Sequence, residues 1–248
     1  MGEQPSRIYL YAVVDGDASL SQSLFGFAPT PVWLLPVGKV AAVVGAVAIE
    51  QIKETSTAAL VHEEVIEKLM AERRVLPVRF GAVFSSVEAL SSALAERHDL
   101  LYADLRRLDG RVEVGVRILW DGTGRRVRAS DFQAMKIATG SSQGAGGPGM
   151  EYMRARMTEV AVERHLRQEA EELGQRCRAI LAPYASALRL KTLVTEEIPV
   201  SVACLVSREA VGPLVGAANR LHELEPDIRA VCTGPWPPYH FVTDSEGA

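Results

Sequence analysis

The first 121 residues combine two spacings of hydrophobic positions. Apolar residues three or four positions apart predict helices at about 55–73 and 85–108. The run at 75–84 is expected to be extended, because Pro77 disfavours helix just before it. Short apolar runs next to turn signals predict further strands at 8–14, 32–37, 40–47 and 112–120. This order indicates an α+β domain over residues 1–121, with a mixed sheet and both helices on one face.

Residues 150–248 predict a second α+β domain. A narrow apolar stripe in a strongly charged stretch predicts one long helix from 151 to about 184, ended by Pro183. Another helix is expected at 211–224. The predicted strands are 188–194, 200–206 and 228–232. After them the chain ends in a tail rich in proline and aromatic residues.

The segment 122–149 differs in composition from both flanking regions. It contains seven glycines, four basic residues and one acidic residue. A polar, glycine-rich stretch of this kind is typical of a flexible connection. We therefore expect a glycine-rich basic linker over residues 122–149, between the two domains.

The charge balance and the cysteine count exclude several classes of protein. The chain has 27 Lys and Arg against 31 Asp and Glu, a net charge of −4, which argues against nucleic acid as the main partner. Its three cysteines form no C-x-x-C pair, so we exclude a disulfide framework and expect a reducing compartment. We find no signal peptide and no apolar run long enough to cross a bilayer. These features favour a cytoplasmic protein without a lipid membrane as partner.

Three short motifs match chemical signatures but lack the context that the chemistry needs. Residues 62–66 begin like the zinc-protease H-E-x-x-H, but position 66 is isoleucine, so His62 is interpreted as part of a solvated helix start. Residues 140–144 match G-x-S-x-G without the strand and helix of a nucleophile elbow. Residues 144–149 match G-x-G-x-x-G, with a proline inside the motif. We predict no catalytic residue, no metal site and no cofactor.

One arginine interrupts the apolar run that ends in Phe80 and Gly81. If Arg79 is buried, its guanidinium needs carboxylate or carbonyl partners, and it would clamp a loop or a helix end. The alternative is a contact for an acidic partner. The pattern favours the clamp, because a charged side chain is buried only when it is paired.

Three aromatic residues stand among the prolines of the tail. These residues are Trp236, Tyr239 and Phe241, and the prolines around them impose an extended, stiff chain. The tail either folds back as a lid over its own domain or presents its aromatic side chains to another protein. The lid is favoured, because aromatic side chains are more often buried than displayed.

Four motifs, in the same order along the chain, resemble the gas vesicle protein F/L family. The first is LPVRFG at 76–81, which follows a helix that opens with His62 and Glu63. The others are VEVGV at 112–116 followed by Trp120, then Gly149 with Tyr152, Met153 and Arg156, and TGPWPPY at 233–239. The chain departs from the family pattern at Met153, Ser201 and His240.

The resemblance implies a two-domain α+β protein whose C-terminal domain is a ferredoxin-like variant with a long leading helix. It also implies a non-enzymatic accessory role in gas vesicle formation, in the cytoplasm and at the gas vesicle during assembly. The expected partners are the hydrophobic main shell protein and other gas vesicle accessory proteins, and the alternative role is a minor structural component retained in the shell. The candidate partner-binding residues are Arg79, Phe80, Tyr152, Met153, Met157, Trp236, Tyr239 and Phe241.

Overall fold

The chain folds into two compact α+β units. The computed structural model describes residues 7–20, 23–28, 30–48, 52, 56–140, 148–193 and 195–243. The first unit comprises Met1–Glu113 and Trp236–Ala248, and the second comprises Val114–Pro235. The chain therefore leaves the first unit inside strand β6 (Arg111–Leu119) and returns to it inside strand β9 (Arg229–Trp236). These divisions differ from the expected ones at 121 and 149, which followed the composition of the chain.

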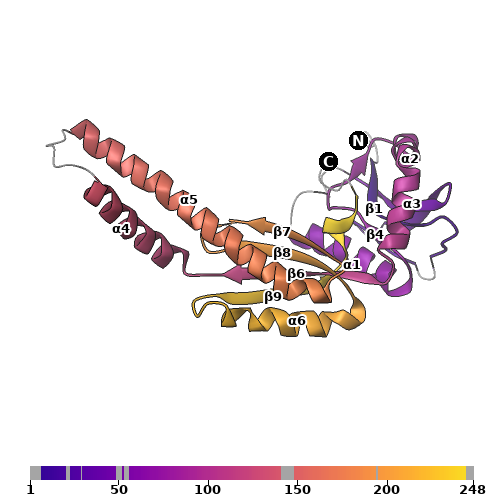
Figure 1. Ribbon diagram of the computed structural model, residues 1–248. Coiled ribbons are helices and arrows are strands. Elements are labelled where there is room, and N and C mark those ends of the chain that lie inside the picture. Colours follow the sequence, from indigo (N-terminus) through magenta and orange to yellow (C-terminus); the bar gives the residue numbers. More distant parts are fainter. Residues whose placement is uncertain are drawn as a thin grey trace. The chain divides into compact units, whose positions relative to one another are not determined.

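The first unit is built on an antiparallel sheet (Figure 1). Its strand order is β2-β3-β1-β4, and β5 pairs with β1 off this path. The described pairs of this sheet are all antiparallel, where a mixed sheet was expected. Its strands are β1 (Arg7–Asp15), β2 (Val32–Val37), β3 (Val40–Val47), β4 (Leu76–Pro77) and β5 (Val83–Phe84). Instead of one extended run at 75–84, two short strands thus flank a loop.

Three α-helices complete the described part of the first unit. Helix α1 (Ser56–Glu72) buries Val65 and Leu69 as its apolar spacing predicts. The helix expected at 85–108 is divided at Arg97, which takes a non-helical conformation between α2 (Val87–Glu96) and α3 (His98–Arg107). Ser86 caps the start of α2, because its side chain accepts a hydrogen bond from the backbone N–H of Ala89 at 3.2 Å.

The second unit has the ferredoxin-like order of elements. Leaving aside α4, they run β6-α5-β7-β8-α6-β9, and the sheet order is β7-β8-β6-β9. The sheet therefore needs β6, which the composition had assigned to the first domain. The other elements of this fold are α5 (Pro148–Leu181), β7 (Ala187–Thr192), β8 (Val200–Ser207) and α6 (Val211–Asn219).

Helix α4 (Gly122–Gly140) occupies most of the segment predicted as a linker. Asp121 caps it by accepting a hydrogen bond from the N–H of Gly124 at 2.9 Å. Gly122 is required by packing, because a Cβ there would collide with the carbonyl oxygen of Glu196. Part of the glycine content that suggested a linker thus serves the start of a helix. Residues 141–147, with most of the two glycine motifs, lie outside the described residues.

Helices α4 and α5 lie side by side within the second unit (Figure 1). Ala129 of α4 forms a small buried cluster with Val162 and Leu166 of α5. We call α4 and residues 148–167 of α5 the helical hairpin. No helix in the described part of the chain combines the length and the apolar character that a membrane crossing requires.

Candidate interaction surface

His62 lies in the core of the first unit, not on a solvated helix start as the sequence pattern predicted. Only 1% of the residue is exposed. Its Nε2 lies 2.9 Å from the carbonyl oxygen of Val78, and its Nδ1 lies 2.9 Å from the hydroxyl of Tyr9. A carbonyl oxygen can only accept, so Nε2 of the neutral ring carries the proton and Nδ1 accepts from Tyr9. Burial lowers the pKa of His62 to about 4, which keeps the ring neutral at pH 7.

The same contacts fix the loop that carries Arg79. The Tyr9 hydroxyl accepts a hydrogen bond from the N–H of Gly81 at 3.0 Å, while His62 binds the loop at Val78. Gly81 has φ +96°, a conformation that favours glycine. Phe80 packs its ring against Tyr9 and His62, with centroids 6.3 and 5.8 Å apart. A buried tyrosine and histidine therefore hold both sides of the loop, a role that the sequence pattern did not reveal.

Arg79 itself is exposed to solvent. It makes no ion pair or hydrogen bond with the residues that the structure describes. The clamping alternative is therefore not supported, and Arg79 stands as a single cation on a fixed loop. A contact with an acidic partner stays a prediction for this residue.

The aromatic tail folds back onto the first unit. Phe241 is 4% exposed, and the Tyr239 hydroxyl donates a hydrogen bond to Oε1 of Glu63 at 2.8 Å. Trp236, at the start of the tail, is 42% exposed. The tail is thus folded back, but onto the first unit and not onto the C-terminal domain as the lid prediction had it. Of the three tail aromatics, Phe241 is interior and does not form a displayed surface.

Two buried carboxylates hold this tail. Glu113 accepts hydrogen bonds from the backbone N–H of His240 at 3.0 Å and from its ring Nδ1 at 2.6 Å. Asp104 accepts from the N–H of Thr243 at 2.6 Å and from its hydroxyl at 3.0 Å. In addition, Arg107 donates to the carbonyl oxygen of Phe241 at 2.6 Å. The tail is therefore a structural part of the first unit.

A network around Arg125 fixes the base of the helical hairpin in the second unit. The guanidinium of Arg125 lies 4.5 Å from the ring centroid of Trp120, donates to both carboxylate oxygens of Asp227, and pairs with Glu225. Burial alone would raise the pKa of Glu225, but hydrogen bonds from Arg125 and Arg176 outweigh burial and hold it below its ordinary range. The hydrogen bonds from Arg125 likewise hold the pKa of Asp227 low.

We predict that Arg125→Met lowers the free energy of unfolding of the second unit by about 2 kcal/mol, because it leaves two carboxylates without their shared partner. Urea unfolding followed by circular dichroism measures the change. Arg126→Met is the matched control. Among the described residues Arg126 pairs with Glu196 alone, both side chains are more than 40% exposed, and we expect a loss below about 1 kcal/mol. Equal losses for the two variants would contradict the prediction.

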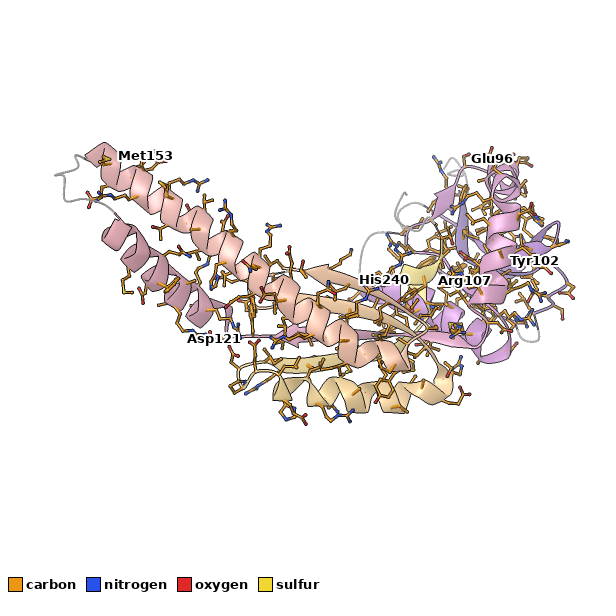
Figure 2. The ribbon with its side chains drawn as sticks, in the orientation of Figure 1. Glu96, Tyr102, Arg107, Asp121, Met153 and His240 are labelled. Atoms are coloured by element: carbon orange, nitrogen blue, oxygen red, sulfur yellow. The ribbon has the colours of Figure 1, made fainter. Side chains whose placement is uncertain are left out.

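The N-terminal part of α5 exposes an apolar stripe to solvent. Met150, Met153, Met157 and Val160 are 53%, 58%, 59% and 41% exposed, and we call them the methionine stripe. Their spacing of three and four residues places them on one face of the helix. Val162 marks the face of α5 that contacts α4. Met153 lies nine residues earlier, and nine steps of about 100° place it on the opposite side of the helix, so the stripe faces away from α4. Figure 2 shows Met153 close to the N-terminal end of α5.

A shallow groove follows this stripe. It has a volume of about 310 Å³ and is lined by Met153, Arg156, Met157, Val160, Ala161 and Arg164. Tyr152, also predicted for partner binding, is 71% exposed but lies outside this groove. The predicted residues are therefore dispersed: Met153 and Met157 share the groove, and the loop and tail residues belong to the first unit. Among the described residues no group of three or more His, Cys, Asp or Glu is arranged to hold a metal ion.

Solved structures share this fold. The crystal structure of gas vesicle protein GvpF from Microcystis aeruginosa superposes with a TM-score of 0.76 at 19% identity, covering 96% of this chain and 99% of that chain. GvpF from Anabaena sp. PCC7120 gives the same TM-score at 22% identity, covering 96% and 98%. These likenesses confirm the α+β fold.

Sequence comparisons give the family. Gas vesicle protein F2 of Halobacterium salinarum is 24% identical over 247 residues, which cover 98% of this chain and 95% of that protein. Gas vesicle protein L of a Streptomyces species is 28% identical over 259 residues, covering 96% and 93%. A family model described as gas vesicle synthesis protein GvpL/GvpF matches residues 7–243. The match extends over both units, and the chain therefore belongs to the GvpL/GvpF family of gas vesicle synthesis proteins.

Proposed function

We propose that this protein is a non-enzymatic accessory factor of gas vesicle formation that binds the hydrophobic main shell protein during assembly. It acts in the cytoplasm, together with other gas vesicle accessory proteins. Membership of the GvpL/GvpF family supports a role in gas vesicles. The observation that carries the proposal is the methionine stripe, an exposed apolar surface on α5.

Exposed apolar residues in a continuous row are unusual on a protein that acts alone. Single exposed hydrophobic side chains are normal, but a contiguous patch marks an interaction site. The stripe spans about three helical turns, and no described side chain buries it. Methionine side chains are flexible and polarizable, so they adapt to partner surfaces of differing shape.

The chemistry of the partner fits this surface. A shell subunit that builds a gas-facing wall needs an extensive apolar surface, and it would aggregate if that surface met water before assembly. An accessory protein that covers part of the apolar surface keeps the subunit in solution until it is added to the shell. This task needs contact area and reversibility, and it needs no catalytic group.

Co-expression with the main shell protein tests the proposal. We expect tagged wild-type protein to hold the shell protein in the soluble fraction and to retain it in a pull-down. The double variant Met153→Ser/Met157→Ser should retain about fivefold less, because it removes two central apolar contacts while changing only exposed positions.

The matched control is Leu60→Ser/Val231→Ser. These residues are 68% and 43% exposed, lie outside the hairpin, and lose comparable apolar surface. The control should retain the shell protein as the wild type does. If the wild type retains none, the proposed function is wrong. If the methionine variant retains as much as the control, the stripe is not the binding surface.

A further inference from the structure

The helical hairpin differs in charge from the rest of the chain. Residues 122–167 contain eight Lys and Arg against four Asp and Glu, a net charge of +4. The remaining residues contain 19 Lys and Arg against 27 Asp and Glu, a net of −8. Neutralisation at the base accounts for part of this excess, since Arg125 is surrounded by carboxylates. Residues 148–167 of α5 contain four arginines against three glutamates, a net charge of +1.

Arginine side chains line the groove along the methionine stripe. Arg156 and Arg164 stand eight residues apart, about 12 Å along the helix axis, with Met157 and Val160 between them. The apolar floor of the groove is thus flanked by two guanidinium groups on the same side of the helix. Such a combination of apolar floor and cationic border selects a partner that is both apolar and acidic.

Both guanidinium groups are available to a partner. Arg164 is exposed and makes no ion pair with the described residues. Arg156 pairs with Glu159 at 2.6 Å, but the two side chains are 63% and 50% exposed, so this surface pair is weak and easily exchanged. An arginine binds a carboxylate with two parallel hydrogen bonds, which is stronger than a contact with a neutral acceptor.

We propose that this groove of α5 binds an acidic amphipathic helix of a partner protein. The stripe has the spacing of a helix-packing seam, so a second helix laid along it buries apolar side chains at its own i, i+3, i+4 and i+7 positions. Glu or Asp residues beside that seam pair with Arg156 and Arg164. This inference deepens the proposed function and rests on it, because it names the kind of partner segment that the methionine stripe receives.

A helix fits the surface better than an anionic membrane does. Helices that lie in membrane interfaces present lysine or arginine on the polar face and large residues such as Trp, Phe and Leu on the apolar face. Here the apolar side chains are methionine and valine, and Glu159 and Glu163 follow on the flank toward α4. A flat anionic membrane surface would meet these carboxylates together with the arginines, which weakens its attraction to this face of the helix.

Peptide binding to the full-length protein tests the inference. The probe is a fluorescent synthetic peptide of about 18 residues, five helical turns, with leucine at helix-seam spacing and glutamate beside it. A second peptide has the same leucines and lysine in place of each glutamate. Fluorescence anisotropy should show that the acidic peptide binds wild-type protein about tenfold more tightly than the basic one.

Two variants locate the binding. Arg156→Glu/Arg164→Glu should weaken the acidic peptide at least about tenfold. Arg178→Glu/Arg220→Glu carries the same change in net charge at exposed positions outside the groove, and we expect a change below about twofold. Equal affinity for the two peptides, or equal weakening by both variants, would overturn the inference. So would binding of anionic vesicles in place of the peptide, or dimerisation of the protein that only the groove variant abolishes.

The two proposals can fail separately. If the acidic peptide binds the groove but the main shell protein is not retained in co-expression, the groove has another acidic partner and the proposed function falls. If the shell protein is retained through the methionine stripe but the acidic peptide does not bind, the proposed function stands and the inference about an acidic helix is overturned.

Discussion

Removal of residues 236–248 is expected to unfold the first unit. The truncation takes away Phe241, which is 4% exposed, and the loss of a buried phenylalanine side chain alone costs about 3–5 kcal/mol. It also leaves Glu113 and Asp104 buried without the hydrogen bonds that His240 and Thr243 donate, at about 1–3 kcal/mol each. Together these losses are comparable with the whole stability of a domain of this size.

Thermal unfolding and limited proteolysis measure this effect. We expect the truncated protein to lose the cooperative transition of the first unit, while the second unit stays resistant to protease. Trp236→Ala is the control, because Trp236 is 42% exposed and the loss of its side chain should change the transition little. A truncated protein that unfolds with the wild-type transition would show that the tail is not part of the core.

The expected unfolding decides how the tail can be examined as a binding surface. Loss of a partner after truncation would report the loss of the first unit, and it would say nothing about aromatic contacts. Trp236→Ala removes the exposed aromatic side chain and keeps the anchors at Glu113 and Asp104. A pull-down with this variant therefore separates a contact made by the tail from its structural role.

The spacing of apolar residues located most of the helices and strands, because an element that buries one face needs apolar residues at regular intervals. The apolar face of α1 and the extended strand at 40–47 were both predicted, since each depends on residues close together in sequence. The assignment of β6 to the second sheet depends on pairing with strands more than 80 residues later in the chain, which local patterns do not encode. Composition therefore placed the domain boundaries at 121 and 149, whereas the compact units divide after Glu113 and after Pro235.

Helix α4 was missed because glycine has two roles. A high glycine content indicates a flexible segment on average, but Gly122 is needed for close packing against the chain at Glu196. The basic residues that supported a linker are partly committed to ion pairs, as Arg125 is with Glu225 and Asp227. Only the partners, which lie about a hundred positions away, distinguish a buried guanidinium from a solvated one.

The candidate site was predicted in part for the same reason. The stripe at Met153 and Met157 could be found from spacing, because helix geometry alone places these residues on one face. Whether that face is buried or displayed depends on α4, and the exposure of 58% and 59% is a result of the fold. The burial of His62 likewise depends on Tyr9 and Val78, so no pattern within α1 could distinguish it from a solvated residue.

The first unit should lose stability in mild acid through His62. In the folded protein burial lowers the pKa of His62 to about 4, whereas the unfolded chain has the ordinary value of about 6.5. The unfolded state therefore binds more protons between these values, so the contribution of His62 is complete above pH 6.5 and is lost as the pH falls toward 4. A difference of about 2.5 pKa units corresponds to about 3 kcal/mol.

Urea unfolding at a series of pH values compares the wild type with His62→Gln. Glutamine keeps a donor for the Val78 carbonyl and an acceptor for the Tyr9 hydroxyl, but it does not titrate. Burial raises the pKa of Glu63, which acts in the opposite direction, but both proteins share this contribution and it cancels in their difference. We expect the two stability curves to approach each other by about 3 kcal/mol between pH 6.5 and 4. Parallel curves would mean that His62 becomes protonated in the folded protein without loss of its contacts, and the fixed loop around Arg79 would then need another explanation.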